Sequence, residues 1–127
     1  MLQEYVKATN KTFELTLSDL KDRLAERKFG VLAAISLSDK FKDKGIEYLG
    51  QLTILEVCNP FEAAAALAIN PVAAYFLPCK ILVREVNGCT LIEMAKPSSL
   101  IEILHEPKLI DFARKIEDLL IEAADAV

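Results

Sequence analysis

The stretch Lys80–Met94, K-I-L-V-R-E-V-N-G-C-T-L-I-E-M, decides the fold class of this 127-residue chain. Two apolar runs flank Asn87-Gly88. A type I′ turn needs positive φ at both central residues, and Asn-Gly meets this need at low steric cost. The stretch therefore predicts a β-hairpin with strands over 80–86 and 89–94. Because hairpin strands are antiparallel neighbours, a largely antiparallel sheet is favoured.

The segment before the hairpin predicts a strand that leads directly into a helix. Gln51–Cys58 is apolar on both faces, which is typical of a strand packed on two sides. Asn59 then suits an N-cap, Pro60 suits the first helical position, and Glu62 completes the start signal. An alanine-rich helix is expected to run to about Ile69, because Pro71 cannot continue it.

The N-terminal part predicts two more strands with a helix between them. Lys11–Leu17 alternates apolar and polar residues, which indicates a half-buried strand. Ser18 is expected to cap a short helix over Asp19–Phe29, with Gly30 as its left-handed C-cap. Val31–Leu37 is the second predicted strand. The charged segment that follows, over 38–45, is expected to be a loop with about one helical turn.

After the hairpin the pattern changes to helices. A short helix is expected over Leu100–Leu104, and an amphipathic helix over Pro107–Ala126. Glu117 and Asp118 are interpreted as exposed solubility charges on the longer helix. Residues 1–127 are thus expected to form one α+β domain, in which helices pack on one face of a sheet of about five strands.

Composition narrows the classes of function. The 15 Lys and Arg residues against 19 Asp and Glu residues give a net charge of −4, which disfavours nucleic acid as the main partner. Prolines interrupt the longest weakly charged stretch, over 63–82, so no membrane span is expected. The N-terminal residues lack a basic region followed by an apolar run, which predicts a cytoplasmic protein without a signal peptide.

Two motifs are expected to meet at one end of the sheet. They are Cys58-Asn59-Pro60, at the predicted strand-to-helix junction, and Leu77-Pro78-Cys79, before the next strand. Free amides and the positive helix dipole at that helix start would lower the pKa of the Cys58 thiol, or hold an anion. Both effects make this junction the candidate site.

A purely structural interpretation stays open at the same residues. Capping alone explains Asn59 and Pro60, and buried cysteine is often only a small apolar side chain. The odd count of three cysteines argues for reduced thiols, although a disulfide between Cys58 and Cys79 is not ruled out by spacing. The single histidine, His105, is interpreted as a surface residue between two helices.

Several motifs together resemble the DUF302 family. They are F-G-V-L-x-x-I-x-L from Phe29, K-x-K-G-I from Lys42, V-C-N-P from Val57, A-x-x-A-L near Ala63 and L-P-C from Leu77. The resemblance covers roughly residues 12–97. It implies a small, mainly prokaryotic protein of unknown function, with a TBP-like α+β fold and often a homodimer. The chain departs from the family pattern at Lys80, where Asn is common, and at Met94-Ala95-Lys96-Pro97, which replaces the common Met-Asp-Pro.

Two functional hypotheses follow. The first is a non-enzymatic cytoplasmic module that forms a homodimer or binds a small molecule or anion, with candidate ligand-binding residues Cys58, Asn59, Pro60, Cys79 and Lys80. The second is a thiol-based redox or soft-metal-binding protein that uses Cys58 and Cys79. The sequence names no cofactor and no catalytic residue, and a nucleic-acid role would rest on fold analogy alone.

Overall fold

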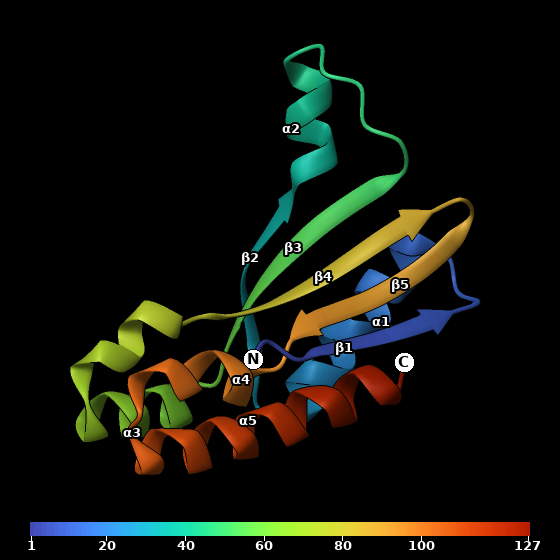
Figure 1. Ribbon diagram of the computed structural model, residues 1–127. Helices are drawn as coiled ribbons and strands as arrows, with labels where there is room; N and C mark the ends of the chain where they lie inside the picture. The colour runs from blue at the N-terminus through green and yellow to red at the C-terminus, as the bar shows by residue number, and fades with distance from the viewer.

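The computed structural model describes all 127 residues. Strands and helices alternate in the N-terminal half, two consecutive strands follow, and the chain ends in its longest helix (Figure 1). The elements are β1 (Glu4–Thr9), α1 (Phe13–Glu26), β2 (Gly30–Ser36), α2 (Leu37–Asp43), β3 (Gln51–Cys58), α3 (Pro60–Ile69), the 3₁₀ helix η1 (Pro71–Phe76), β4 (Cys79–Val86), β5 (Cys89–Ala95), α4 (Pro97–Ile101), the 3₁₀ helix η2 (Glu102–Leu104) and α5 (Pro107–Asp125).

The five strands form one antiparallel sheet in the order β1-β5-β4-β3-β2. The predicted hairpin is confirmed, since β4 and β5 are joined at Asn87-Gly88, where both residues have positive φ. Strand β3 has the predicted bounds. The predicted α+β class with an antiparallel sheet is therefore confirmed.

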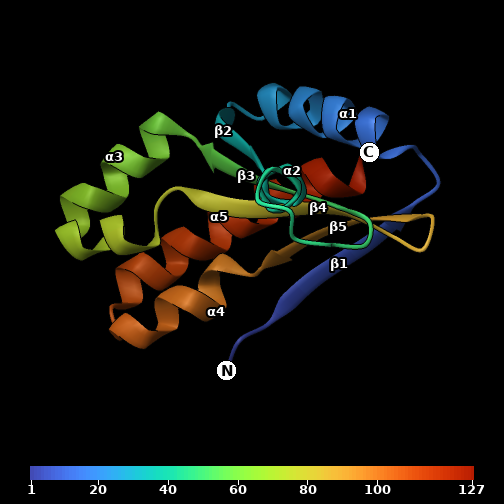
Figure 2. The same ribbon diagram turned by 90° about the horizontal axis from the view of Figure 1, so that it is seen from above.

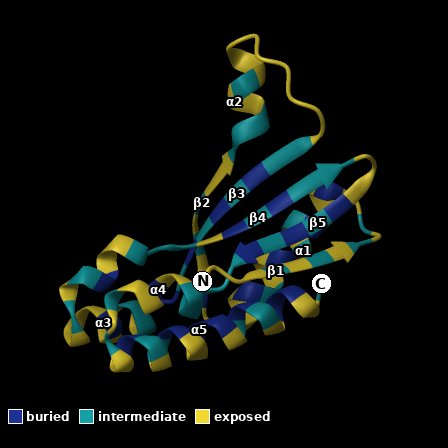
Figure 3. Ribbon diagram, viewed as in Figure 1, coloured by how far each residue is buried: buried dark blue, intermediate teal, exposed yellow.

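Helices α1 and α5 pack on the same face of the sheet and enclose the main core (Figures 1 and 2). Leu20 and Leu24 of α1 and Leu120 of α5 are fully buried there against β3, β4 and β5. Figure 3 shows the buried positions along these facing surfaces, whereas most of α2 and its loop are exposed or half-buried. No helix combines the length and apolar character that a membrane span requires.

The N-terminal prediction is wrong in detail. Residues 11–17 are not a strand, because Thr12 caps a helix there: its Oγ1 accepts from the Leu15 amide at 3.1 Å, and α1 begins at Phe13. Buried Phe13, Thr16, Leu20 and Leu24 follow helical spacing, which overrides the short alternation. Ser18 therefore lies inside the helix and is not its cap.

The true first strand is β1, which the sequence analysis missed. It pairs with β5 at the edge of the sheet and is held to the end of α5. The Tyr5 hydroxyl donates to Asp125, and Lys7 Nζ donates to the carbonyls of Ala124, Asp125 and Val127 at 2.8–3.1 Å. A lysine at a helix C-terminus satisfies carbonyls that have no partner in the helix and complements the dipole.

Three other helix boundaries also differ from those predicted from the sequence. Helix α1 ends at Glu26 and is followed by Lys28, not Gly30, in the left-handed region, while Gly30 is the first residue of β2. Helix α2 has seven residues and, with its loop, projects from one end of the sheet (Figure 1). Helix α4 begins at Pro97 instead of near Leu100, because the Glu117 carboxylate accepts hydrogen bonds from Ser98 in its first turn.

Candidate functional site

The two predicted motifs meet at the end of the sheet opposite α2. Strands β3 and β4 are antiparallel neighbours, with Val57 paired opposite Cys79. This pairing places the end of β3 beside the start of β4. Cys58 lies next to Val57, so its side chain leaves the sheet on the face opposite that of Cys79. Both cysteines are free and half-buried.

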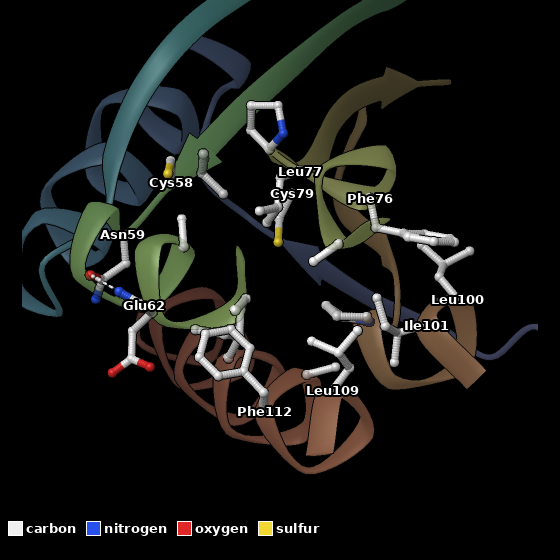
Figure 4. Close-up of a pocket in the computed structure, with 18 of the residues that line it drawn as sticks. Cys58, Asn59, Glu62, Phe76, Leu77, Cys79, Leu100, Ile101, Leu109 and Phe112 are labelled. Atoms are coloured by element: carbon white, nitrogen blue, oxygen red, sulfur yellow. Dashed lines mark hydrogen bonds between the residues drawn. The ribbon is translucent and has the colours of Figure 1, made fainter. Parts of the chain in front are cut away.

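A cavity of about 280 Å³ lies beneath this junction. It is enclosed by the ends of β3 and β4, by α3 and η1, and by α4 and the first half of α5 (Figure 4). Of its 22 lining residues, 17 are hydrophobic. Its volume is close to the lower limit of roughly 300–1,000 Å³ that is common for small-molecule sites. The arrangement therefore has the size and chemistry of a site for a small apolar molecule.

The structure brings four of the five predicted site residues to this cavity. Cys58, Asn59, Cys79 and Lys80 all line it, and in Figure 4 the Cys79 sulfur points into the space toward α5. Pro60 does not line it and is the exposed first residue of α3, a position that suits proline at the start of a helix.

The predicted anion site at the start of α3 is closed by the chain itself. Asn59 Oδ1 accepts from the Phe61 and Glu62 amides at 3.1 and 3.2 Å, and the Asn59 carbonyl accepts from the Ala63 amide at 2.8 Å. The expected free amides are therefore satisfied. An anion there would have to displace this cap and would meet the carboxylate of Glu62.

The thiols are not activated in the way that the sequence analysis expected. Burial raises the pKa of Cys58 above its ordinary value. The pKa of Cys79 rises to about 11, first because the thiol is buried and then because Cys58 and Glu56 lie nearby. The predicted lowering of the Cys58 pKa is thus wrong, because burial disfavours the charged thiolate.

The charged groups at the cavity are engaged with partners outside it. Glu62 binds Lys115 of α5, with 2.8 Å between Oε1 and Nζ. Lys80 forms an ion pair with Glu56 across β3 and β4. In Figure 4 the Glu62 carboxylate is turned away from the space between the labelled apolar side chains. No group of three or more His, Cys, Asp or Glu residues is arranged to hold a metal ion.

The opposite wall of the cavity was not anticipated from the sequence. Leu109 and Phe112 of α5, Ile101 of α4, and Tyr75 and Phe76 of η1 all line the space. The amphipathic stripe of α5 marks Leu109 and Phe112 as inward-facing, but it does not indicate what they face. His105 is exposed between η2 and α5, as predicted.

Comparison with known proteins identifies the family. The model of the family described as "Domain of unknown function DUF302" matches residues 5–127. The protein belongs to the DUF302 family. The crystal structure of an uncharacterized conserved DUF302 protein from Bacillus stearothermophilus is similar, with 38% identity, a TM-score of 0.94, and coverage of 96% of this chain and 95% of that chain. No curated protein matches this chain.

The positions that depart from the DUF302 pattern cluster at the cavity. Lys80 and Ala95 both line it, and Pro97, which follows Lys96, lines it as well.

Proposed function

We propose that this DUF302 protein is a non-enzymatic binding module for a small apolar molecule, held in the cavity between β3, β4, α3, α4 and α5. The single observation that carries the proposal is the predominance of hydrophobic residues around a cavity of about 280 Å³. A binding site typically buries most of its ligand against apolar walls, with few polar groups to orient it. Cys58, Asn59, Cys79 and Lys80 are the polar or sulfur-bearing groups at the β3–β4 side of this site.

The thiol-based alternative has weaker support. A redox or soft-metal site uses thiolates, and the raised pKa values of Cys58 and Cys79 keep both thiols protonated at neutral pH. Their side chains also leave the sheet on opposite faces, an arrangement that does not favour a disulfide between them.

A fluorescent probe tests the proposed function. N-phenyl-1-naphthylamine is uncharged and brightens in apolar surroundings, so saturable binding to the wild-type protein is expected. Ala63→Phe places a ring in the cavity, because Ala63 lines it, and should weaken probe binding by about tenfold or more. Ala64→Phe is the matched control, since Ala64 is the adjacent, exposed alanine of the same helix.

Circular dichroism and urea unfolding establish that both variants fold. Weaker binding in Ala63→Phe alone supports the proposed site. No saturable binding to the wild type, or equal affinity in all three proteins, contradicts it.

We also infer that the protein acts in the cytoplasm as a homodimer. The three free thiols suit a reducing compartment. Edge strand β2, G-V-L-A-A-I-S, has no charged side chain, and such an edge is open to pairing with a second copy. Light scattering should give twice the 14.1 kDa chain mass, and Leu32→Lys at the exposed edge should lower it to that of one chain. A wild-type mass of one chain contradicts the dimer.

A further inference from the structure

We propose that the cavity selects molecules without a formal charge, such as an aliphatic alcohol or an unsubstituted aromatic compound, and rejects carboxylates, phosphates and ammonium ions of similar size. This inference rests on the proposed binding function and specifies the class of its ligand.

The inner wall offers no counter-charge to a ligand. Phe76, Leu109 and Phe112 surround the space toward which the Cys79 sulfur points (Figure 4). A charge moved from water into such surroundings loses its hydration and gains no ion pair in return. Each 1.4 kcal/mol of that loss lowers affinity about tenfold. An uncharged molecule of the same shape does not lose this hydration free energy.

Lys80 offers no counter-charge to an anionic head group, because it follows Cys79 along β4 and its side chain leaves the sheet on the opposite face. Lys80 is the ion-pair partner of Glu56, whose side chain is only 13% exposed. The second oxygen of Glu56, Oε2, is already buried without a hydrogen-bond partner. Drawing Lys80 toward a ligand would leave the whole carboxylate buried without its cation, which is strongly unfavourable. Lys80 is therefore not free to bind an anion.

A cationic head group meets the corresponding obstacle at Glu62. Its carboxylate is held by Lys115 at 2.8 Å, an ion pair that also joins α3 to α5 beside the cavity. A ligand cation would have to displace Lys115 from this pair. The amides at the start of α3 are not available to an anion, because Asn59 Oδ1 already accepts their hydrogen bonds. All charges around the cavity are thus neutralised within the protein.

Competition against the bound naphthylamine probe tests this selectivity on the intact protein. The competitors are octan-1-ol, octanoate and octylammonium at neutral pH, which share one chain and differ in head-group charge. Octanol should displace the probe at a concentration about tenfold or more below that of either charged competitor. A charged competitor that matches octanol within tenfold would overturn the inference.

A variant distinguishes the lack of a free counter-charge at the cavity from a general preference for hydrophobic molecules. Ala63→Lys places a cation without a partner in the cavity lining, because Ala63 lines the cavity, so octanoate should gain about fivefold or more in affinity relative to octanol. An unchanged ratio of the two affinities would also overturn the inference. If the probe itself does not bind the wild type, the proposed function fails and this inference fails with it. If the probe binds and octanoate is preferred, only the inference fails.

Discussion

The two halves of α5 belong to one amphipathic helix and yet face different surroundings. The C-terminal half places Leu120, Ala123 and Ala124, all fully buried, against the sheet and α1. The N-terminal half places Leu109 and Ala113 beside Ala66 of α3, Ala73 of η1 and Ile101 of α4. The residues of the C-terminal half close the main core, whereas those of the N-terminal half line the cavity.

The difference lies in the size of the partners. Opposite the C-terminal half, three strands and α1 present leucine, isoleucine and valine side chains that fill the space. Opposite the N-terminal half, α3 presents Ala63 and Ala66 and η1 presents Ala73, and these small side chains leave space between the larger side chains of the walls. One half of the helix therefore contributes chiefly to stability, and the other half is available to a ligand.

Enlarging one alanine in each half tests this comparison directly. Ala124→Leu adds volume to a closed core and should lower the free energy of unfolding by about 2 kcal/mol. Ala113→Leu extends into the cavity and should leave that free energy unchanged or raise it by up to about 1 kcal/mol. Urea unfolding measures both changes. A similar loss in the two variants would mean that the cavity is not open space.

The border between the halves is held by Glu117, a charge that the sequence analysis wrongly placed in solvent. Its carboxylate is buried and accepts from the Ser98 amide at 3.1 Å and the Ser98 hydroxyl at 2.7 Å, which attaches α4 to α5. Glu117→Ala should cost about 1.5 kcal/mol and weaken probe binding, because α4 forms part of the cavity wall.

The adjacent exposed residue provides the control. Asp118→Ala should change the free energy of unfolding by less than about 0.5 kcal/mol and leave probe binding unchanged. Equal effects of the two substitutions would show that Glu117 does not hold α4.

The smallest expected effect is the part of the alkaline pH dependence of stability that the Cys79 thiol contributes at the cavity end. The pKa of Cys79 is about 11 in the folded protein, against an ordinary value of 9.0. Above about pH 9 the unfolded chain releases this proton while the folded protein keeps it, so stability is lost as the pH rises from about 9 through about 11. Urea unfolding across this range should show a shallower decline in Cys79→Ala than in the wild type. Identical declines in stability for the two proteins would mean that the Cys79 thiol is exposed to solvent in the folded protein.

Local sequence patterns predicted several parts of this structure correctly. Asn87-Gly88 predicted the hairpin, and Asn59 and Pro60 predicted the start of α3. The apolar stripe of α5 predicted which face of that helix is buried. These features depend on φ angles, capping bonds and periodicity, which involve only neighbouring residues. Where two local signals competed, as at Thr12 and Phe13, the prediction chose the strand and was wrong, because the cap and the longer helical spacing decided the outcome.

The cavity could be predicted only in part. The sequence by itself placed Cys58 and Asn59 at the end of one strand and Cys79 and Lys80 at the start of the next, because strand ends follow from short-range pattern. The long-range pairing of β3 with β4 across α3 and η1 then decided that these two strand ends lie side by side. Only the tertiary structure decided that α5 and α4, more than 30 positions away from Cys58 along the chain, complete the walls, and that Lys115 and Glu56 pair with the charged groups Glu62 and Lys80. Burial and ion pairing depend on which distant surfaces come together, and no local pattern encodes that choice.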